Sequence, residues 1–116
     1  MPTNCLPNLK KPTASRRASP PRQVAYAKAF LKDWDRRSRS GRFNMGLLKE
    51  AMLLLIANDA PLGAEWRDHS LKGDWIGHRE CHIGGDFLLI YELDAATAPG
   101  GLVFVRVGTH SELFSE

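Results

Sequence analysis

The chain has 116 residues, of which 43% are hydrophobic and 25% charged, values typical of one globular domain rather than a fibrous or repetitive protein. Its longest apolar run, residues 51–57, is far shorter than the ~18 residues of a membrane span. The N-terminus has no apolar segment of the secretory kind, and Cys5 and Cys81 are too few for a disulfide scaffold. These features favour a cytoplasmic protein.

Positive charge is concentrated in the first half of the chain. Residues 1–49 carry 12 Lys and Arg against two acids, a net charge of +10, whereas residues 50–116 have a net charge of −7. A basic half is typical of docking on a polyanion, through release of phosphate counterions. It is equally typical of a solvated tail and helix face, so charge alone leaves both alternatives open.

The first half predicts an extension, a strand and a helix. Residues 1–21 contain five of the seven prolines and no acid, which indicates a flexible basic extension before a globular domain at residues 22–116. Residues 23–26 predict a short strand. Apolar side chains then recur with helical spacing, which predicts an amphipathic helix over 27–37. Its apolar face would carry Ala27, Phe30, Leu31 and Trp34, and its outer face Lys28, Lys32, Asp33, Arg36 and Arg37.

The remaining elements complete an α+β fold. A second helix is predicted over 44–58, capped by Asn44 and apolar enough to lie against a sheet. After an irregular segment at 63–74, strands are predicted over 75–83, 86–93 and 102–107, with residues 84–85 (Gly-Gly) as a hairpin turn. The order is β-α-α-β-β-β, a small, mainly antiparallel sheet with two helices on one face. The uncovered face would carry the polar residues.

All four histidines lie between positions 69 and 110, and two kinds of site are poorly supported. His78 and His82 share a predicted strand face beside Cys81, but no Cys-x-x-Cys or His-Glu-x-x-His pattern is present, so the sequence predicts no metal site. A Gly-x-Ser-x-Gly elbow is also missing, which argues against a serine hydrolase. His78 is interpreted as a surface strand residue.

The other candidates fit metal-free cleavage of a phosphodiester. Such a site needs a base, an acid and a cation, and histidine near neutral pH suits the first two roles while arginine suits the third. Each residue has a plainer alternative: a loop histidine is often polar surface, and Arg106 could pair with Glu80 or Asp86. The hypothesis therefore depends on their convergence on one small sheet. The candidates are His69, His82, Asp86, Arg106 and His110.

Four motifs, in order, give the chain a family resemblance. They are Asp68-His69-x-Leu-x-Gly-x-Trp75, Arg79-Glu80-Cys81-His82-Ile83, Asp86-x-Leu-Leu-Ile-Tyr91 and Gly108-Thr109-His110-Ser111-Glu112-Leu113-Phe114. Across about residues 22–114 the chain resembles the YafQ-type toxins of the RelE/ParE superfamily, from bacterial type II toxin–antitoxin modules. The resemblance implies the same small sheet with two helices.

The resemblance also implies an activity. Such toxins enter the ribosomal A site and cut mRNA there by attack of the 2′-hydroxyl on the scissile phosphate, without a metal or another cofactor. His69, Asp86 and His110 match general acid/base positions, His82 matches a further active-site histidine, and Arg106 matches the phosphate-stabilising arginine. The resemblance does not decide which histidine is the base. Phe114 matches an aromatic residue that positions the substrate, and Phe87 replaces a common tryptophan while keeping a stacking surface.

The implied partners are the ribosome with its mRNA and a cognate antitoxin. The antitoxin would be DinJ-like, of the ribbon-helix-helix type, so operator DNA would be contacted only through it, and no membrane partner is expected. Two alternatives stay open. One is a ParE-like toxin that poisons DNA gyrase without cutting RNA, and the other is a catalytically silent protein that only binds its antitoxin as a corepressor.

Overall fold

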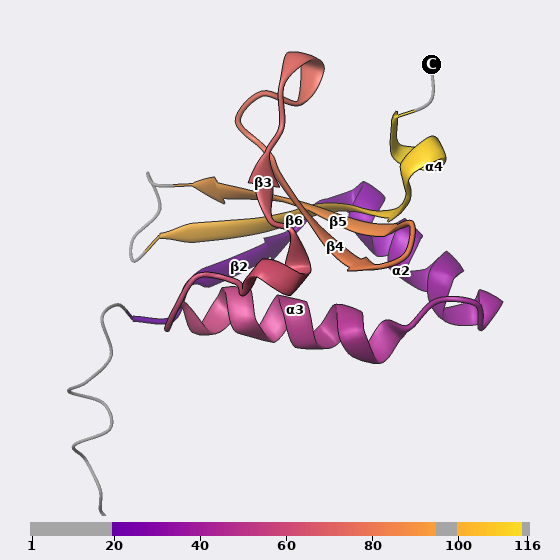
Figure 1. The fold of residues 1–116 in the computed structure, drawn as a ribbon, viewed down its shortest axis with the longest axis horizontal. Helices are drawn as coiled ribbons and strands as arrows, with labels where there is room; N and C mark the ends of the chain where they lie inside the picture. The colour runs from indigo at the N-terminus through magenta and orange to yellow at the C-terminus, as the bar shows by residue number, and fades with distance from the viewer. Residues whose placement is uncertain (1–19, 95–99, 115–116) are drawn as a thin grey trace, which may run out of the picture.

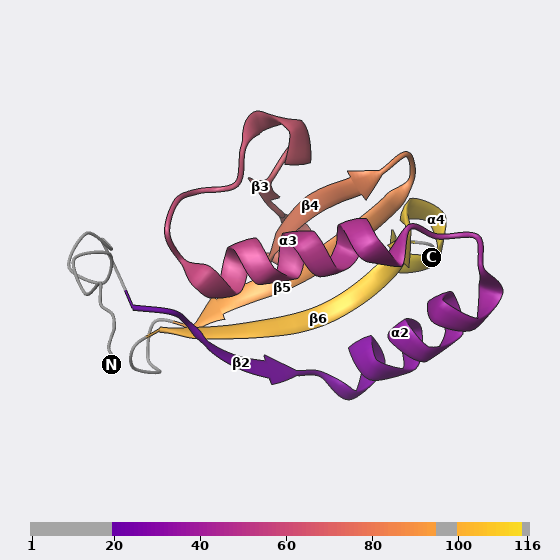
Figure 2. The ribbon, with the colours of Figure 1, turned by 90° about the horizontal axis from the view of Figure 1, so that it is seen from below.

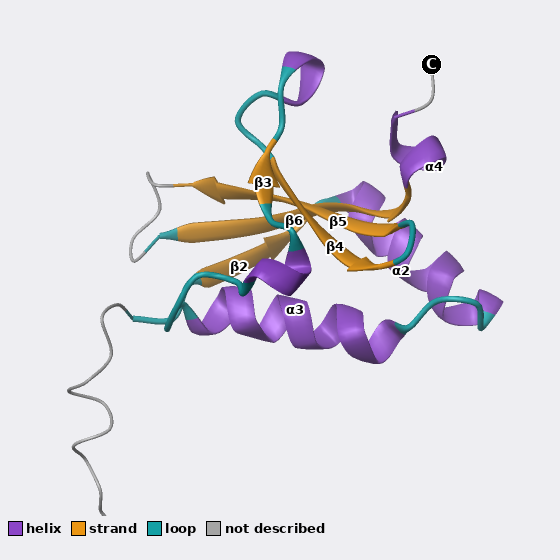
Figure 3. Cartoon of the chain, in the orientation of Figure 1, coloured by secondary structure: helices purple, strands orange, loops and turns teal. Residues whose placement is uncertain are grey.

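The structure, a computed structural model, describes residues 20–94 and 100–114. The predicted extension, residues 1–21, therefore lies outside the described residues except for Pro20 and Pro21. Figure 3 shows the helices, strands and loops of the described chain. In chain order the elements are β2 (Gln23–Tyr26), α2 (Lys28–Ser40), α3 (Met45–Ala57), the 3-10 helix η1 (Ala64–Trp66), β3 (His69–Ser70), the 3-10 helix η2 (Gly73–Trp75), β4 (Arg79–Gly84), β5 (Phe87–Asp94), β6 (Gly101–Thr109) and α4 (His110–Phe114).

The strands form one sheet in the order β2-β6-β5-β4-β3. The pair β2–β6 is parallel and the other three pairs are antiparallel. In Figure 1, α3 lies below the sheet, while α4 and the loop that contains η2 lie above it. Figure 2, seen from below, shows α3 running across the sheet and α2 beyond the end of β2. The predicted α+β fold with a mainly antiparallel sheet is confirmed.

The main core lies between the sheet and the two long helices. Leu48, Ala51, Met52 and Leu55 of α3 pack against buried strand residues, with Phe30 of α2 completing the cluster. The Asn44 side chain accepts a hydrogen bond from the Leu47 amide, which confirms the predicted cap of α3. No helix among the described residues is long and apolar enough to cross a membrane.

Two predictions about the second half were wrong in detail. The strand predicted over 75–83 begins only at Arg79, because Trp75 closes η2 and Gly77 adopts φ 91°, which ends extended backbone. The hairpin turn is Gly85–Asp86, one residue later than predicted, with Gly85 at φ 54°. Two elements were not predicted, since β3 lies in the segment taken as irregular and α4 follows the last strand.

The predicted outer face of α2 was wrong at two of its five residues, and one residue of the predicted apolar face is on the surface. Asp33 and Arg37 are buried, with exposed fractions of 1% and 4%, while Leu31 is 52% exposed. The spacing of apolar residues predicts that the hydrophobic side of the helix is buried. In the structure Asp33 and Arg37 can be buried instead, because each forms an ion pair with a residue outside α2. Leu31 is left on the surface beside the half-buried Trp34.

Asp33 closes a free strand edge. Because β2 ends at Tyr26, opposite Phe104, the second half of β6 has no neighbouring strand on that side. There the Asp33 carboxylate accepts the Val107 amide at 3.1 Å and the Arg106 guanidinium at 2.7 and 3.1 Å. Buried polar groups need hydrogen-bond partners, and the Asp33 carboxylate is the partner of both the Val107 amide and the Arg106 side chain.

A β-bulge interrupts the alternation of faces along β6. Ile90 pairs with Arg106 and Tyr91 pairs with Phe104, so Val105 is the extra residue. Unbroken alternation would put Val107 on the face opposite to Phe104, but the bulge brings both into the main core. Val105 lies on the face opposite to Phe104, against the small cluster of Leu88 and Ile90.

Replacing Asp33 tests its role at the sheet edge. Asp33→Ala leaves the Val107 amide and the Arg106 guanidinium without their shared acceptor, so we expect the free energy of unfolding to fall by about 2–4 kcal/mol. Urea unfolding measures this free energy. Asp35→Ala is the matched control, because Asp35 is exposed and pairs with the exposed Arg39, and we expect a change within about 0.5 kcal/mol. Equal effects of the two variants would contradict this account.

Candidate active site

The sheet register brings the candidate residues onto one face. Residues directly opposite in paired strands share a face, and one row runs His69, Glu80, Ile90, Arg106 from β3 to β6. The next row runs His82, Leu88, Gly108. This is the face opposite to α3, and we call it the catalytic face. Arg106 lies two strands from Glu80, roughly 10 Å at the usual strand spacing.

Glu80 gathers two of the histidines. Its Oε1 lies 3.0 Å from His69 Nε2 and 3.6 Å from His82 Nε2, and the two imidazole rings are 5.9 Å apart. The carboxylate is 4% exposed, and its second oxygen, Oε2, is buried without a hydrogen-bond partner among the described residues. His69 Nδ1 also faces the Arg67 carbonyl oxygen at 2.9 Å. Both nitrogens of His69 thus face oxygen atoms.

The same three residues could hold a metal ion. The ligand atoms of His69, Glu80 and His82 lie within 4.8 Å of one another. Cys81, although adjacent in sequence, is buried in the main core on the other face. Burial raises the pKa of the Cys81 thiol to about 12, so the thiol stays protonated and takes no part in the cluster.

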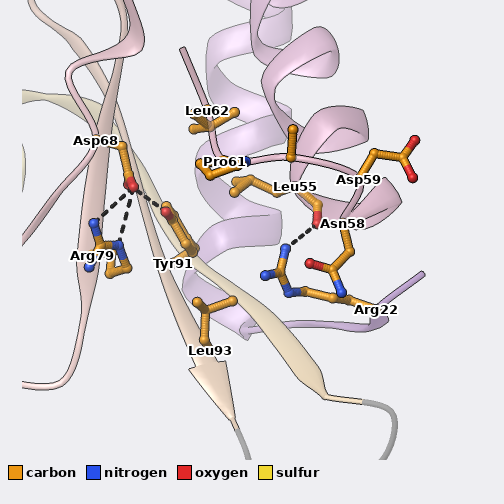
Figure 4. A pocket seen from close by; sticks show the side chains of 11 residues that line it. Arg22, Leu55, Asn58, Asp59, Pro61, Leu62, Asp68, Arg79, Tyr91 and Leu93 are labelled. Atoms are coloured by element: carbon orange, nitrogen blue, oxygen red, sulfur yellow. Dashed lines mark hydrogen bonds and ion pairs between the residues drawn. The ribbon is translucent and has the colours of Figure 1, made fainter. Parts of the chain in front are cut away.

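A partly buried network on the helix side of the sheet fixes the strand that carries His69. Arg79 donates to the Asp68 carboxylate at 2.9 Å and to the Ser70 hydroxyl at 2.8 Å, so one guanidinium holds both neighbours of His69. The Tyr91 hydroxyl donates to the other oxygen of Asp68. Figure 4 shows the contacts of Asp68 with Arg79 and Tyr91 on the wall of a cavity of about 350 Å³. The Asp68 hydrogen bond raises the pKa of Arg79, which keeps the clamp charged.

Arg106 is held from α2 rather than from the sheet. Its Nε and Nη2 donate to Asp33, so Asp33 is the partner in place of the considered Glu80 or Asp86. This hydrogen bonding raises the pKa of Arg106. The Nη1 amine lies outside this pair of bonds and is the part of the fork that a phosphate could approach.

α4 brings His110 and Phe114 to the end of β6. The Asp86 carboxylate accepts the His110 amide at 3.1 Å, so the two residues come together through the backbone of His110. The His110 ring lies 4.8 Å from the Phe114 ring, which in turn lies 5.8 Å from Trp75. Leu113 is buried against Leu88 and Ile90 on the catalytic face.

Two residues do not join the site. Phe87 is 4% exposed and lies in the main core, with its ring 4.6 Å from that of Phe43, so the structure does not bring it to the histidines. His78 precedes β4 and packs edge-on against Trp75, 5.3 Å between ring centroids. It is not among the residues that surround Glu80.

Glu80 is the site residue that the sequence interpretation missed. From the sequence, Glu80 is interpreted only as a possible partner for Arg106. An acid two residues before a histidine on the same strand face was the available signal. What the sequence could not show is that β3 pairs His69 directly opposite Glu80.

Known protein families and proteins are similar to this chain. Residues 22–115 match the family described as "Bacterial toxin of type II toxin-antitoxin system, YafQ". The mRNA interferase toxin YafQ of Escherichia coli (strain K12) is 39% identical over 93 residues, covering 80% of this chain and 96% of that protein.

Two solved structures are similar. The E. coli DinJ–YafQ complex gives a TM-score of 0.69 at 37% identity, covering 81% of this chain and 99% of that one. A metal-bound toxin from Helicobacter pylori gives a TM-score of 0.69 at 37% identity, covering 79% and 98%. The fold and the family match thus define the class of the protein, a RelE/ParE-like toxin domain of a bacterial type II toxin–antitoxin system. Within that class, the chain belongs to the YafQ family.

Replacing Tyr91 tests the network behind His69. Tyr91→Phe removes a hydrogen bond to a carboxylate, so we expect the free energy of unfolding to fall by about 1–3 kcal/mol at neutral pH. Burial, and then the bond to Asp68, raise the pKa of Tyr91 above its ordinary value of 10. Above pH 10 the unfolded chain therefore loses this proton first, and stability falls as pH rises further.

The variant should lack that alkaline component, as measured by urea unfolding across pH. Tyr26→Phe is the matched control, because Tyr26 is half-exposed; we expect its stability to stay within about 0.5 kcal/mol of the parent. An unchanged alkaline slope in Tyr91→Phe would show that the hydroxyl is not held as described.

Proposed function

We propose that the protein is a ribosome-dependent endoribonuclease that cuts mRNA in the A site, with the cytoplasm as its place of action. The observation that carries the proposal is the catalytic face itself, on which Glu80 holds His69 and His82 while Arg106 lies in the same row. The E. coli relative named mRNA interferase supports it.

The chemistry needs only the side chains of this face. A base takes the proton of the 2′-hydroxyl, and the 2′-oxygen forms a bond to phosphorus as the bond to the 5′-oxygen breaks. An acid protonates that leaving oxygen, which gives a 2′,3′-cyclic phosphate and a 5′-hydroxyl. Arg106 stabilises the charge on the phosphorane through Nη1. His110 and the two histidines held by Glu80 supply the base and the acid, with Asp86 holding His110 and Phe114 positioning the nucleotide.

Removing His110 tests the activity. His110→Ala should lower the single-turnover rate of cleavage on programmed ribosomes by about 10²–10⁴-fold, the usual contribution of an acid or base. His78→Ala is the matched control and should stay within a few-fold of the parent. Toxin that has been stripped of metals by a chelator, with the chelator removed before the ribosomes are added, should cleave at the parent rate, because no step uses a metal held by the toxin. Cleavage by His110→Ala within threefold of the parent would refute the assignment.

Mapping of 5′ ends in cells separates this function from its alternatives. Induction of the toxin should produce new ends that depend on translation. Intact mRNA together with gyrase-linked DNA breaks would instead favour the ParE-like alternative. Intact mRNA without such breaks would favour the silent corepressor.

The exposed side of α2 is where we propose that a DinJ-like antitoxin binds. The DinJ–YafQ complex shows that a similar toxin assembles with such a protein. Here Tyr26, Phe30, Leu31, Trp34 and Met52 line an apolar hollow of about 230 Å³. Three exposed lysines lie on the helices that line it: Lys28, Lys32 and Lys49. The ammonium group of Lys49 lies 5.9 Å from the centre of the Trp34 ring. An acidic amphipathic segment fits this surface better than the basic residues 1–19 of the chain itself.

A charge placed in the hollow should weaken the complex. Leu31→Asp should raise the dissociation constant of the cognate antitoxin at least tenfold, measured by calorimetry, because it puts a carboxylate against an apolar, acidic partner. Ile76→Asp is the matched control, since Ile76 is exposed next to η2, and its affinity should stay within twofold. Equal affinities of both variants would place the antitoxin elsewhere.

A further inference from the structure

Arg37 is a buried charge on α2 that lies close to the end of β6. Its Nη2 lies 2.5 Å from Glu112 Oε1 in α4, and its guanidinium lies 5.2 Å from the centre of the Phe43 ring. The contact requires glycine at position 108, because a Cβ there would lie 2.8 Å from Arg37 Nη2 and 3.3 Å from Glu112 Oε1. The backbone of Gly108, the helix α4 and the Arg37–Glu112 ion pair therefore lie in direct contact.

Glu112 has a second function, because it caps the helix it belongs to. Thr109 donates to Oε1 from its amide at 3.1 Å and from its hydroxyl at 2.9 Å, and the Glu112 amide donates back to that hydroxyl at 3.3 Å. This is a capping box, and it satisfies the free amides of the first turn of α4. The Thr109 backbone bond, with help from the Arg37 charge, lowers the pKa of Glu112 and keeps it ionised. One oxygen thus joins α2 to the start of α4.

α4 depends on such anchors. It has only five residues, too few to be stable alone, so its place is set by contacts outside the helix. Leu113 supplies an apolar contact, Asp86 holds the first amide, and Arg37 supplies the ion pair. The helix carries His110 and Phe114, two residues of the proposed site.

We propose that Arg37 is a positioning residue, which through its ion pair with Glu112 holds α4 so that His110 and Phe114 stand at the catalytic face. The inference rests on the proposed function. Arg37 is itself too buried to meet RNA, so it acts through the helix. A misplacement of about 1 Å can cost a hundredfold in rate, and the loss should fall on the cleavage step rather than on ribosome binding.

Arg37→Gln tests the proposal, with Arg39→Gln as the matched control. Arg39 is on the same helix, but it is exposed and pairs with Asp35. In Arg37→Gln we expect the maximal single-turnover rate to fall about 10–100-fold, while the ribosome concentration that gives half of that rate stays within twofold. Amide exchange of residues 110–114, followed by NMR, should become faster. Arg37→Lys should recover part of both losses, and Arg39→Gln should match the parent.

Glu112→Gln removes the same ion pair by changing its more exposed partner. It keeps the proposal testable if Arg37→Gln, which changes a buried residue, does not fold. Glutamine keeps the capping box but not the charge, so the expected losses resemble those of Arg37→Gln and should not add to them in the double variant. A near-parental maximal rate, a loss confined to ribosome binding, or unchanged exchange in α4 would overturn the proposal. If the parent protein did not cut mRNA, the proposed function would fail, while the exchange rates would still show whether Arg37 orders α4.

Discussion

Burying a charged side chain costs several kcal/mol unless its partners are in place, and the catalytic face depends on three such burials. Within the described residues the buried charged side chains are Asp33, Arg37 and Glu80. Each contacts an element of the face: Asp33 holds Arg106, Arg37 holds the helix that carries His110, and Glu80 holds His69 and His82. None of these partners is fully buried, so each pair joins an interior group to one that remains accessible.

The spacing of two of these charges explains why α2 has its orientation. Asp33 and Arg37 are four residues apart and therefore lie on one side of the helix, one turn from each other. The carboxylate meets β6 at Val107, and the guanidinium reaches across Gly108 to Glu112. A helix turned to bury Leu31 instead would lose both contacts. The exposure of Leu31 and the apolar hollow beside it follow from this orientation of α2.

The sequence predicted the elements well where periodicity alone decides them. Both long helices, the strand at 23–26 and the last three strands were placed from apolar spacing and from residues such as Asn44. Errors arose where a tertiary contact overrides the local pattern, as in the inward charges of α2 and the bulge at Val105. The two-residue strand at His69 could not be predicted, because it exists only through pairing with β4. Glu80 was missed for the same reason.

Arg106 illustrates why such a site uses arginine rather than lysine. One edge of its guanidinium is taken by Asp33 through Nε and Nη2, which fixes the position of the group at the bulge of β6. Nη1 lies outside these two bonds, so the planar fork lets one side chain be held by a carboxylate and, in the proposed mechanism, bind a phosphate. A lysine ammonium is a single point, and an ion pair with Asp33 would occupy the same atom that a phosphate needs. The carboxylate that satisfies the sheet edge therefore also orients the phosphate-binding group of the proposed mechanism.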